Sequence, residues 1–304
     1  MVHHARLGRM QKLEGLGLAT PIGSAQWTLS PDAEGTLRAL GERSDIIKRL
    51  HRAMSDRSPS DWVVAGEAEV RPVVGRLMER GLDDEMNGSA YAIVDGVDGR
   101  VHHLRLSDLD ATSDAAIGAV VELRRFKDAT GHERAALAVR SDLSIEAQAT
   151  ASGATWLDRR LVDSKPMNLS EVGFGGEVRE ALERRTEYLV GEGLAGRQTQ
   201  RVLFARDLLD TLRQRELAGA SERLATENGL QARSIANGEH VSGVYCQRVI
   251  LASGRFAMID HGLGFSLVPW TPALERQLWR QVTGVAGAGG IDWSFGKRRG
   301  LGIG

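Results

Sequence analysis

The residues with the clearest capacity for chemistry are clustered cations, because guanidinium and ammonium groups bind phosphate. Arg6, Arg9 and Lys12 recur at spacings of three and would share one helical face. A second group surrounds a predicted helix and hairpin, and a third lies in the C-terminal tail. The candidate nucleic-acid contacts are Arg6, Arg9, Lys12, Arg184, Arg185, Arg197, Arg201, Lys297, Arg298 and Arg299.

Groups that could carry covalent or metal chemistry are sparse. The tyrosines are Tyr91, Tyr188 and Tyr245, and the adjacent pairs His3-His4 and His102-His103 would point to opposite faces of a strand. Cys246 lies in an apolar stretch, as expected of a buried structural thiol. Because no nucleophile, base and orienting group occur together, the sequence predicts no catalytic residues, no metal site and no cofactor.

Two glycine motifs superficially resemble ligand loops. Gly173-Phe174-Gly175-Gly176 opens a predicted helix but lacks the Gly-Lys-Ser/Thr that follows in a phosphate loop. Asp95-Gly96-Val97-Asp98-Gly99 lacks the further acidic ligands of a calcium loop. A tight hairpin turn explains the second motif better.

The cations near the start need a helix and a hairpin to position them. Leu7, Met10, Leu13 and Leu16 form an apolar stripe, and Gly17 is expected to end that helix. Residues 18–29 read as two strands around a Pro/Gly turn, and Ser30-Pro31-Asp32 is expected to cap the next helix. Helix, hairpin and helix follow one another in this order at the end of a winged-helix domain.

The same layout recurs later in the chain. Gly15-Leu16-Gly17-Leu18-Ala19 is echoed by residues 191–195, and residues 32–38 align with residues 207–213 after a one-residue gap. In this second copy Ser170 is expected to cap a helix to about Val190, and a helix is predicted from Asp207 to about Ala218. In winged helices the helix before the hairpin enters the major groove, although such units also mediate protein contacts.

Between and after these units, short apolar strands alternate with turns. Residues 89–106 and 119–126 predict strands of one β unit, and residues 243–270 predict those of another. The expected fold class is α+β, with duplicated winged-helix-like units alternating with small antiparallel β-barrel-like units. The expected domains are residues 1–58, 59–150, 151–235 and 236–304.

Composition limits the class of protein. The chain has 304 residues, 42% of them hydrophobic, with no run of 18 apolar residues, no apolar signal core and one cysteine. These features exclude disordered, collagen-like and membrane-spanning classes and predict a cytoplasmic protein without membrane insertion.

The net charge of −1 conceals an uneven distribution. Residues 1–60 carry +3, residues 61–174 carry −7, residues 175–235 are neutral and residues 236–304 carry +3. Local charge governs phosphate binding, so the basic ends are compatible with modest, salt-sensitive binding to DNA. Such fluctuations are also common in proteins that bind no nucleic acid.

Several segments resemble the C-terminal domain of proteobacterial relaxase/mobilisation nucleases, and this resemblance runs over nearly the whole chain. They are residues 41–48, 151–159 (Ala-Ser-Gly-Ala-Thr-Trp-Leu-Asp-Arg), 253–260 (Ser-Gly-Arg-Phe-Ala-Met-Ile-Asp), 267–272, 275–278 and 291–296 (Ile-Asp-Trp-Ser-Phe-Gly). In that family the domain follows a nuclease that nicks plasmid DNA with a tyrosine and a histidine-bound metal. The resemblance implies a role in conjugative transfer through a type IV secretion system.

The nuclease residues themselves have no counterpart here, so the chain is expected to be a truncated or separately encoded C-terminal portion, or a chosen part of a longer protein. The predicted function is a non-catalytic DNA-binding accessory region of a conjugative relaxase. The alternative is a protein-interaction module that docks the relaxase to the relaxosome or the secretion coupling protein. The tail at Lys297, Arg298 and Arg299 fits phosphate contact, coupling-protein docking or a solvated end.

Overall fold

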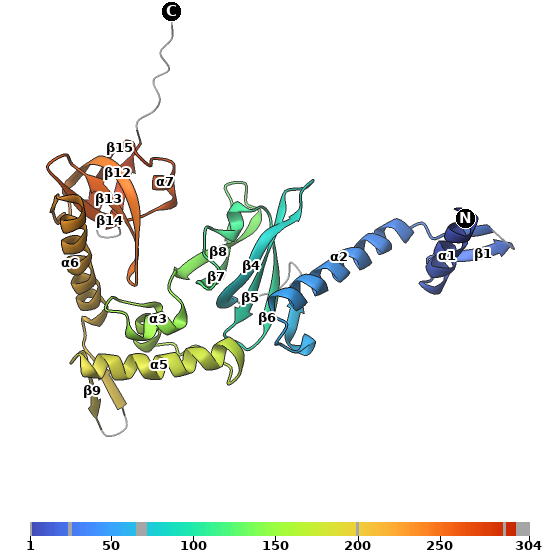
Figure 1. Cartoon of the computed structure of the whole chain (residues 1–304), viewed down its shortest axis with the longest axis horizontal. Coiled ribbons are helices and arrows are strands. Elements are labelled where there is room, and N and C mark those ends of the chain that lie inside the picture. The colour runs from blue at the N-terminus through green and yellow to red at the C-terminus, as the bar shows by residue number, and fades with distance from the viewer. Residues whose placement is uncertain (1, 24–25, 65–71, 199–200, 288–289, 296–304) are drawn as a thin grey trace, which may run out of the picture. The chain divides into compact units, whose positions relative to one another are not determined.

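The computed structural model describes residues 2–23, 26–64, 72–198, 201–287 and 290–295, with only the backbone of residues 2–7. The chain divides into two compact units, Met1–Val64 and Ala65–Gly304. Its elements are helices and sheets (Figure 1), and the strand pairs are antiparallel where their pairing is described, except for one parallel pair at residues 231–232 and 264–265, so the expected α+β class is confirmed. In the described residues no helix is long and apolar enough to cross a membrane.

The first unit is a helix, a hairpin and a second helix, here called the first helical repeat. Its elements are α1 (Val2–Gly15), β1 (Ala19–Gly23), β2 (Gln26–Leu29) and α2 (Ala33–Ala53), followed by η1 (Pro59–Asp61) and β3 (Trp62–Val64). Gly17 adopts φ +72° after α1, a conformation that favours glycine. The predicted cap of α2 is wrong in detail: Asp32 occupies the N-cap without a side-chain cap bond, and Ser30 bonds to the Asp32 carboxylate instead.

The second unit contains the same order of elements, here called the second helical repeat. It consists of α5 (Gly173–Gly191), β9 (Ala195–Gln198), β10 (Arg201–Phe204) and α6 (Leu208–Asn228). The helix α6 ends ten residues later than the sequence predicts, at Asn228, and both α2 and α6 have 21 residues. Ser170 does not cap α5, because Val172 is the N-cap residue and the Ser170 hydroxyl accepts from the Val172 amide.

The backbone bonds of the two helical repeats correspond one to one. The Leu18 amide donates to the Leu13 carbonyl at 2.8 Å, and the Leu194 amide donates to the Leu189 carbonyl at 2.9 Å. After each hairpin, Ser30 and Ala205 donate to the carbonyls of Leu18 and Leu194, both at 2.9 Å. Gly193 repeats the left-handed backbone of Gly17, with φ +71°. The repeated glycine therefore marks a repeated turn geometry.

Each helical repeat precedes a sheet in the chain. The first sheet contains β4 (Val74–Asp84), β5 (Ser89–Gly96), β6 (Val101–Leu106), β7 (Val120–Lys127) and β8 (Glu133–Ser141). The second contains β11 (Gln231–Ala232), β12 (His240–Leu251), β13 (Gly254–Asp260), β14 (Gly264–Pro269), β15 (Gln281–Gly287) and β16 (Gly290–Ser294). Short helices η2 (Asp110–Thr112) and α7 (Pro272–Glu275) occupy the same place in the two sequences of strands.

The two sheets share one topology. The order β6-β5-β4-β7-β8 in the first corresponds to β14-β13-β12-β15-β16 in the second. A bulge separates Leu77 and Glu79 on β4, and another separates Tyr245 and Gln247 on β12. Neither sheet is closed in the described residues, so the expected β-barrel-like units are wrong and open sheets take their place.

Core packing explains the strand pattern. β5 is buried along almost its whole length, and its two alanines and Val94 pack with Leu77 and Leu104. The other face of the sheet supplies Val97 and Val120 to a cluster with Phe174 and Val178 of α5. Apolar burial of this kind is the main stabilising contribution to such a fold.

Two short helices connect the first sheet to α5. They are α3 (Ile145–Thr150) and α4 (Trp156–Leu161), and residues 151–161 are here called the closing segment. Thr155 caps α4 with a complete capping box that includes Asp158. In the second unit this segment packs on the second helical repeat, where Ala154 and Leu161 contact a core that contains Leu189 and Leu212.

Candidate functional site

Arg185 on α5 connects the second helical repeat to the closing segment. Its Nε donates to Asp158 Oδ1 at 2.7 Å and its Nη2 to Asp158 Oδ2 at 2.8 Å, and both side chains are 0% exposed. Further bonds reach the carbonyls of Ala151 at 2.5 Å and Gly153 at 2.9 Å. The guanidinium also lies 4.8 Å from the ring centre of Tyr188. The site is a fully satisfied buried ion pair, and breaking one side of such a pair is costly.

The capping box prepares Asp158 for this role. The Thr155 amide and hydroxyl donate to Asp158 Oδ2 at 2.7 and 2.9 Å, and the Asp158 amide donates to the Thr155 hydroxyl at 3.2 Å. The second sheet then holds the segment, since the Ser253 hydroxyl accepts from the Ala154 amide at 2.9 Å. Arg159 donates to the Ser253 carbonyl at 3.0 Å. These bonds join residues 151–159 to the strand that begins at Gly254.

The equivalent face of the first helical repeat has a different exposure. The matching backbone bonds place Arg9 at the position of Arg185 and Leu37 at the position of Leu212. Leu37 is 40% exposed, whereas Leu212 is 1% exposed, and Arg9 is exposed whereas Arg185 is buried. We call Arg9, Leu13, Leu29 and Leu37 the open face. It is the main candidate site of this protein.

The other members of the open face follow the same trend. Leu13 is half-buried, whereas its counterpart Leu189 is 0% exposed. Leu29 is 52% exposed, and its counterpart Phe204 is half-buried against the core of the second helical repeat. Exposed apolar side chains that gather on one face are typical of an interaction surface.

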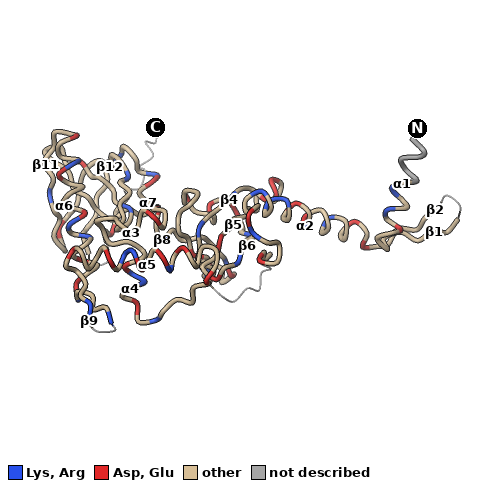
Figure 2. The backbone as a smooth tube through the Cα atoms, turned by 60° about the horizontal axis from the view of Figure 1, so that its bottom comes forward, with Lys and Arg blue, Asp and Glu red and all other residues tan. Residues whose placement is uncertain are grey.

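The predicted cations divide into distinct groups. Arg185 was predicted to contact nucleic acid, and this prediction is wrong because its guanidinium is buried against Asp158. Arg184 on α5 is exposed, but Glu180, Glu183 and Glu187 are exposed on the same helix. Figure 2 shows charges of both signs along α5. The exposed residues of α5 therefore carry charges of both signs, and the prediction for Arg184 stays a prediction.

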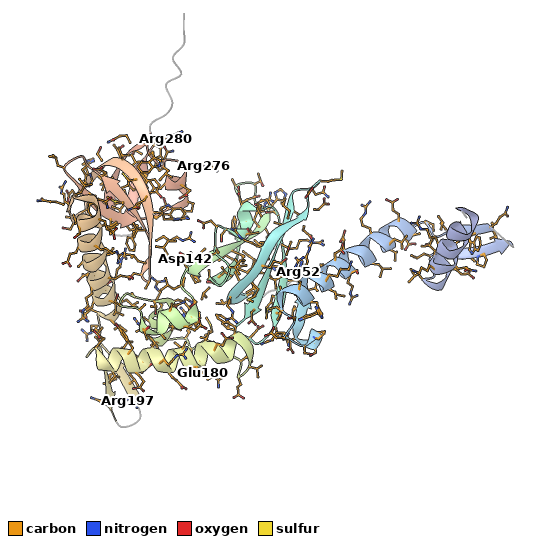
Figure 3. The ribbon with its side chains drawn as sticks, viewed as in Figure 1. Arg52, Asp142, Glu180, Arg197, Arg276 and Arg280 are labelled. Carbon is orange, nitrogen blue, oxygen red and sulfur yellow. The ribbon has the colours of Figure 1, made fainter. Side chains whose placement is uncertain are left out.

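The hairpin and the N-terminal helix retain exposed cations. Arg197 on β9 forms an ion pair with Glu187, and Arg201 on β10 is exposed (Arg197 is labelled in Figure 3). Arg9 and Lys12 are exposed on α1. The side chain of Arg6 and the residues Lys297, Arg298 and Arg299 lie outside the described part of the structure.

The histidine and tyrosine candidates have structural surroundings. His102 is buried with Nε2 3.1 Å from both oxygens of Asp98, and its neighbour His103 stacks on Tyr91 with ring centres 5.5 Å apart. The Tyr91 hydroxyl donates to Glu79 at 2.5 Å. Over the described ranges, no three His, Cys, Asp or Glu side chains form a group that could hold a metal ion.

Cys246 is half-buried and lies at the bulge of β12. Its Sγ is 3.5 Å from the Val244 carbonyl. Burial raises the pKa of the Cys246 thiol, and the carboxylate of Asp260 raises it further. A raised pKa lowers the thiolate fraction and hence the reactivity. The group is therefore suited to packing and poorly suited to nucleophilic chemistry.

The glycine motif at the start of α5 is a packing motif. A Cβ on Gly175 would overlap the Val97 carbonyl oxygen, and Phe174 is 0% exposed in the core. The close approach of this helix to the turn at Val97 explains why glycine is required. The Asp95–Gly99 motif forms the turn between β5 and β6, as the sequence predicts.

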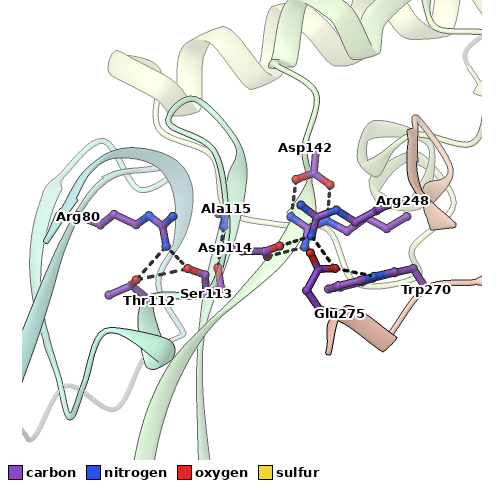
Figure 4. Close-up of polar contacts among 10 residues, drawn as sticks. Arg80, Thr112, Ser113, Asp114, Ala115, Asp142, Arg248, Trp270 and Glu275 are labelled. Atoms are coloured by element: carbon purple, nitrogen blue, oxygen red, sulfur yellow. Dashed lines mark hydrogen bonds and ion pairs between the residues drawn. The ribbon is translucent and has the colours of Figure 1, made fainter. Parts of the chain in front are cut away.

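Sequence reasoning missed a polar cluster between β12, β13 and the first sheet's connecting loops. Arg255 donates to both oxygens of Asp142 at 2.7 and 2.6 Å and to Asp114 at 2.5 Å. Figure 4 labels the two carboxylates, Asp142 and Asp114. Arg248 also pairs with Asp114, and both arginines lie over the ring of Trp270. The paired carboxylates raise the pKa of Arg255. The cluster joins the two sheets within the second unit and is not a catalytic arrangement.

A second missed cluster surrounds Arg159. Burial lowers the pKa of the Arg159 guanidinium, and the neighbouring charges of Arg213 and Arg140 lower it further. Arg213 also lines a cavity of about 470 Å³ together with Asn237, Leu267 and Ile291. Along the sequence, Arg213 follows Arg159 by more than 50 residues and Arg140 precedes it by about 20. No local sequence pattern therefore reveals the cluster.

Fold and site together define a tandem α+β repeat protein with one closed and one open helical repeat. A family model described as "Protein of unknown function (DUF3363)" matches residues 6–130 and 124–302. The chain therefore belongs to this family. No curated protein and no solved structure matches the chain.

Proposed function

We propose that this chain is a non-catalytic docking module whose first helical repeat binds a segment of a partner protein. The observation that carries the proposal is the contrast between Leu37, which is 40% exposed, and Leu212, which is 1% exposed at the equivalent position. In the second helical repeat, Ala154 and Leu161 of the chain's own closing segment belong to the same apolar core as this position. In the first, the same framework presents the face to solvent.

The apolar surface of the first unit extends beyond this position. Leu16, Ile22, Leu40 and Ile47 are 55%, 66%, 44% and 46% exposed. A single exposed leucine is ordinary in a soluble protein, whereas a group on one small unit favours an interface. Docking agrees with the protein-interaction role that we infer as the alternative from the sequence.

A selection of helical peptides against the whole chain tests this proposal. Wild-type protein serves as bait, and the Leu37→Glu variant serves for counter-selection, because a carboxylate on the open face would oppose apolar docking. We expect enriched peptides whose binding is lost in Leu37→Glu and retained in Lys48→Gln, a change at an exposed, paired cation on the same helix. If no enriched peptide depends on Leu37, the docking proposal is wrong.

A second candidate function is contact with DNA, and the charge of α1 favours it. Arg9 and Lys12 are exposed, and the acidic Glu14 of this helix accepts a hydrogen bond from Trp27 Nε1 at 3.1 Å. In this reading the helical repeats are winged-helix-like, and the hairpin residues Arg197 and Arg201 touch phosphate. Salt would weaken such binding strongly, because phosphate neutralisation releases counterions.

Fluorescence anisotropy with duplex and single-stranded origin-of-transfer DNA tests this second candidate. We expect binding at low salt that weakens in the Arg9→Gln/Lys12→Gln variant and is unchanged in Lys48→Gln. Absence of binding at low salt rejects DNA contact without affecting the docking proposal. Binding with a scrambled sequence at equal affinity indicates that phosphate alone is recognised.

The resemblance to relaxase C-terminal domains supplies the biological setting of both candidates. We propose that the module serves conjugative transfer as an accessory region of a relaxase, with relaxosome or secretion coupling proteins as partners. The quoted segments support the resemblance, and the two segments at residues 151–159 and 253–260 meet in the second unit. A pull-down of relaxosome proteins tests this assignment. We expect their capture to survive nuclease treatment and high salt and to be lost in the Leu37→Glu variant.

A further inference from the structure

We propose that the occupant of the open face is a short capped helix that presents a carboxylate to Arg9 and an aliphatic side chain to Leu37. This inference rests on the proposed docking function and specifies the chemistry of its partner. The second helical repeat provides the template, since it holds a segment of this kind in its own closing segment. The proposed occupant is a segment of a partner protein, and the closing segment of this chain shows the chemistry that it needs, since that segment is itself buried on the second helical repeat.

The template defines a polar requirement. Arg185 takes both oxygens of Asp158 and two backbone carbonyls of the closing segment, so the guanidinium donates to four acceptors of one short segment. Bidentate pairing of this geometry is specific to a planar guanidinium and a carboxylate. Arg9 offers the same fork at the equivalent position of the first helical repeat, and it is exposed.

The template also defines an apolar requirement. Ala154 and Leu161 at the two ends of the closing segment pack on the core that contains Leu212 and Leu189. On the open face, Leu37 is the equivalent of Leu212, and Leu13 is the equivalent of Leu189. A partner therefore needs a small residue before its helix cap and an aliphatic residue about seven positions later, on either side of the carboxylate.

The charge of α1 favours a carboxylate as the ligand, because the one acidic side chain of this helix, Glu14, is bonded to Trp27. Glu14 is the acidic side chain of α1 and is engaged with the Trp27 indole, so it is directed to the hairpin. The cations Arg9 and Lys12 consequently set the local charge of α1. An acidic helix N-terminus is complementary to this charge, and the carboxylate of a capping box supplies it in a fixed orientation.

A labelled peptide with the sequence of residues 151–163 is the direct probe, and fluorescence anisotropy with the full chain is the measurement. The peptide contains Asp158, Asp163, Arg159 and Arg160 and has no net side-chain charge. We expect saturable binding to the wild-type chain. The peptide change Asp158→Asn should weaken binding about tenfold or more, since it removes a charge-assisted bidentate pair.

The peptide change Asp163→Asn is the matched control. It alters the net charge equally, but Asp163 pairs with Arg160 and has no contact with Arg185 in the template. On the protein side, Arg9→Gln should weaken binding about tenfold and should make the wild-type and Asp158→Asn peptides equivalent. Lys48→Gln should leave binding unchanged.

The outcomes separate the two proposals. Peptide binding that depends on Asp158 and Arg9 supports the inference. If no binding occurs, or if Asp158→Asn and Arg9→Gln have no effect, the carboxylate assignment is wrong. Peptides from the display selection that need Leu37 but contain no acidic residue would leave the docking function in place and overturn this inference alone.

Discussion

Arg185 and Arg9 show how one residue type at equivalent positions takes two roles. Arg185 is surrounded by carbonyls and Asp158 from a segment that precedes its helix in the chain. Arg9 has the same helical position without a described counterpart of that segment. The side chain alone does not predict which role applies, because the deciding partner lies 27 residues from Arg185.

The buried ion pair gives the first prediction. Replacing Arg185 by Ala leaves the Asp158 carboxylate buried without its cation, so we expect a loss of about 3–5 kcal/mol in the free energy of unfolding. Replacing the exposed neighbour Arg184 by Ala should change it by less than about 0.5 kcal/mol. Urea denaturation of both variants measures the difference. Equal stabilities would contradict the assignment of Arg185 to the core.

The pH dependence of Asp114 gives a second prediction. Burial raises the pKa of Asp114, but hydrogen bonds from Arg255 and Arg248 outweigh it and place the pKa below its ordinary value of 3.8. A carboxyl group whose pKa is lowered in the folded state stabilises the protein at pH values above its ordinary pKa. This contribution disappears as the pH falls through the folded-state pKa.

Thermal unfolding between pH 3 and 7 tests this linkage. The Asp114→Asn variant should be less stable than the wild type at neutral pH, and the difference should shrink towards pH 3. Because Asp114 is 45% exposed, the effect should also decrease with added salt. A stability difference that stays constant over the whole pH range would contradict the role of the ionised carboxylate.

At the scale of elements, the two sheets share features that their sequences largely conceal. Gly75 on β4 and Gly243 on β12 occupy equivalent sites, and a Cβ on either would overlap the backbone oxygen of an aspartate, Asp95 or Asp260. Trp279 has φ +62° and donates to the Tyr245 carbonyl, as Gly118 with φ +91° donates to Leu77. Thus a strained tryptophan stands where the first sheet uses glycine.

The paired glycines give a third prediction. Gly75→Ala and Gly243→Ala should each destabilise the chain by about 1–3 kcal/mol, since a methyl group has no room against a neighbouring strand's backbone. Gly219→Ala in α6 is the control, because its Cβ would meet no atom within 4 Å. That change should stabilise by about 0.5–1 kcal/mol. Similar effects at all three sites would argue against the shared topology.

The sequence was informative where a short motif determines a turn. Gly17 and Gly193 lie in equivalent left-handed positions, and the predicted hairpins follow them. The open sheets could not be distinguished from barrels, because closure depends on pairing between edge strands far apart in the chain. The burial of Arg185 and the Arg255 cluster also escaped prediction, since both depend on contacts between distant segments.

At the scale of the whole molecule, the chain contains the same order of elements twice. Helix, hairpin, helix, short strand and sheet occur from α1 to β8 and again from α5 to β16. Two copies of one framework allow one to fulfil a structural role while the other keeps its face available. In this protein the closing segment assigns the structural role to the second copy.

The central claim is that the open face of the first helical repeat binds a segment like the closing segment. Methyl NMR of the leucine side chains, recorded on the full chain during titration with the 151–163 peptide, tests it most directly. We predict shift changes at Leu37 and Leu13, with Leu212 and Leu189 unchanged because their site is already filled. Changes confined to Leu212 and Leu189, or no change at Leu37, would contradict the claim.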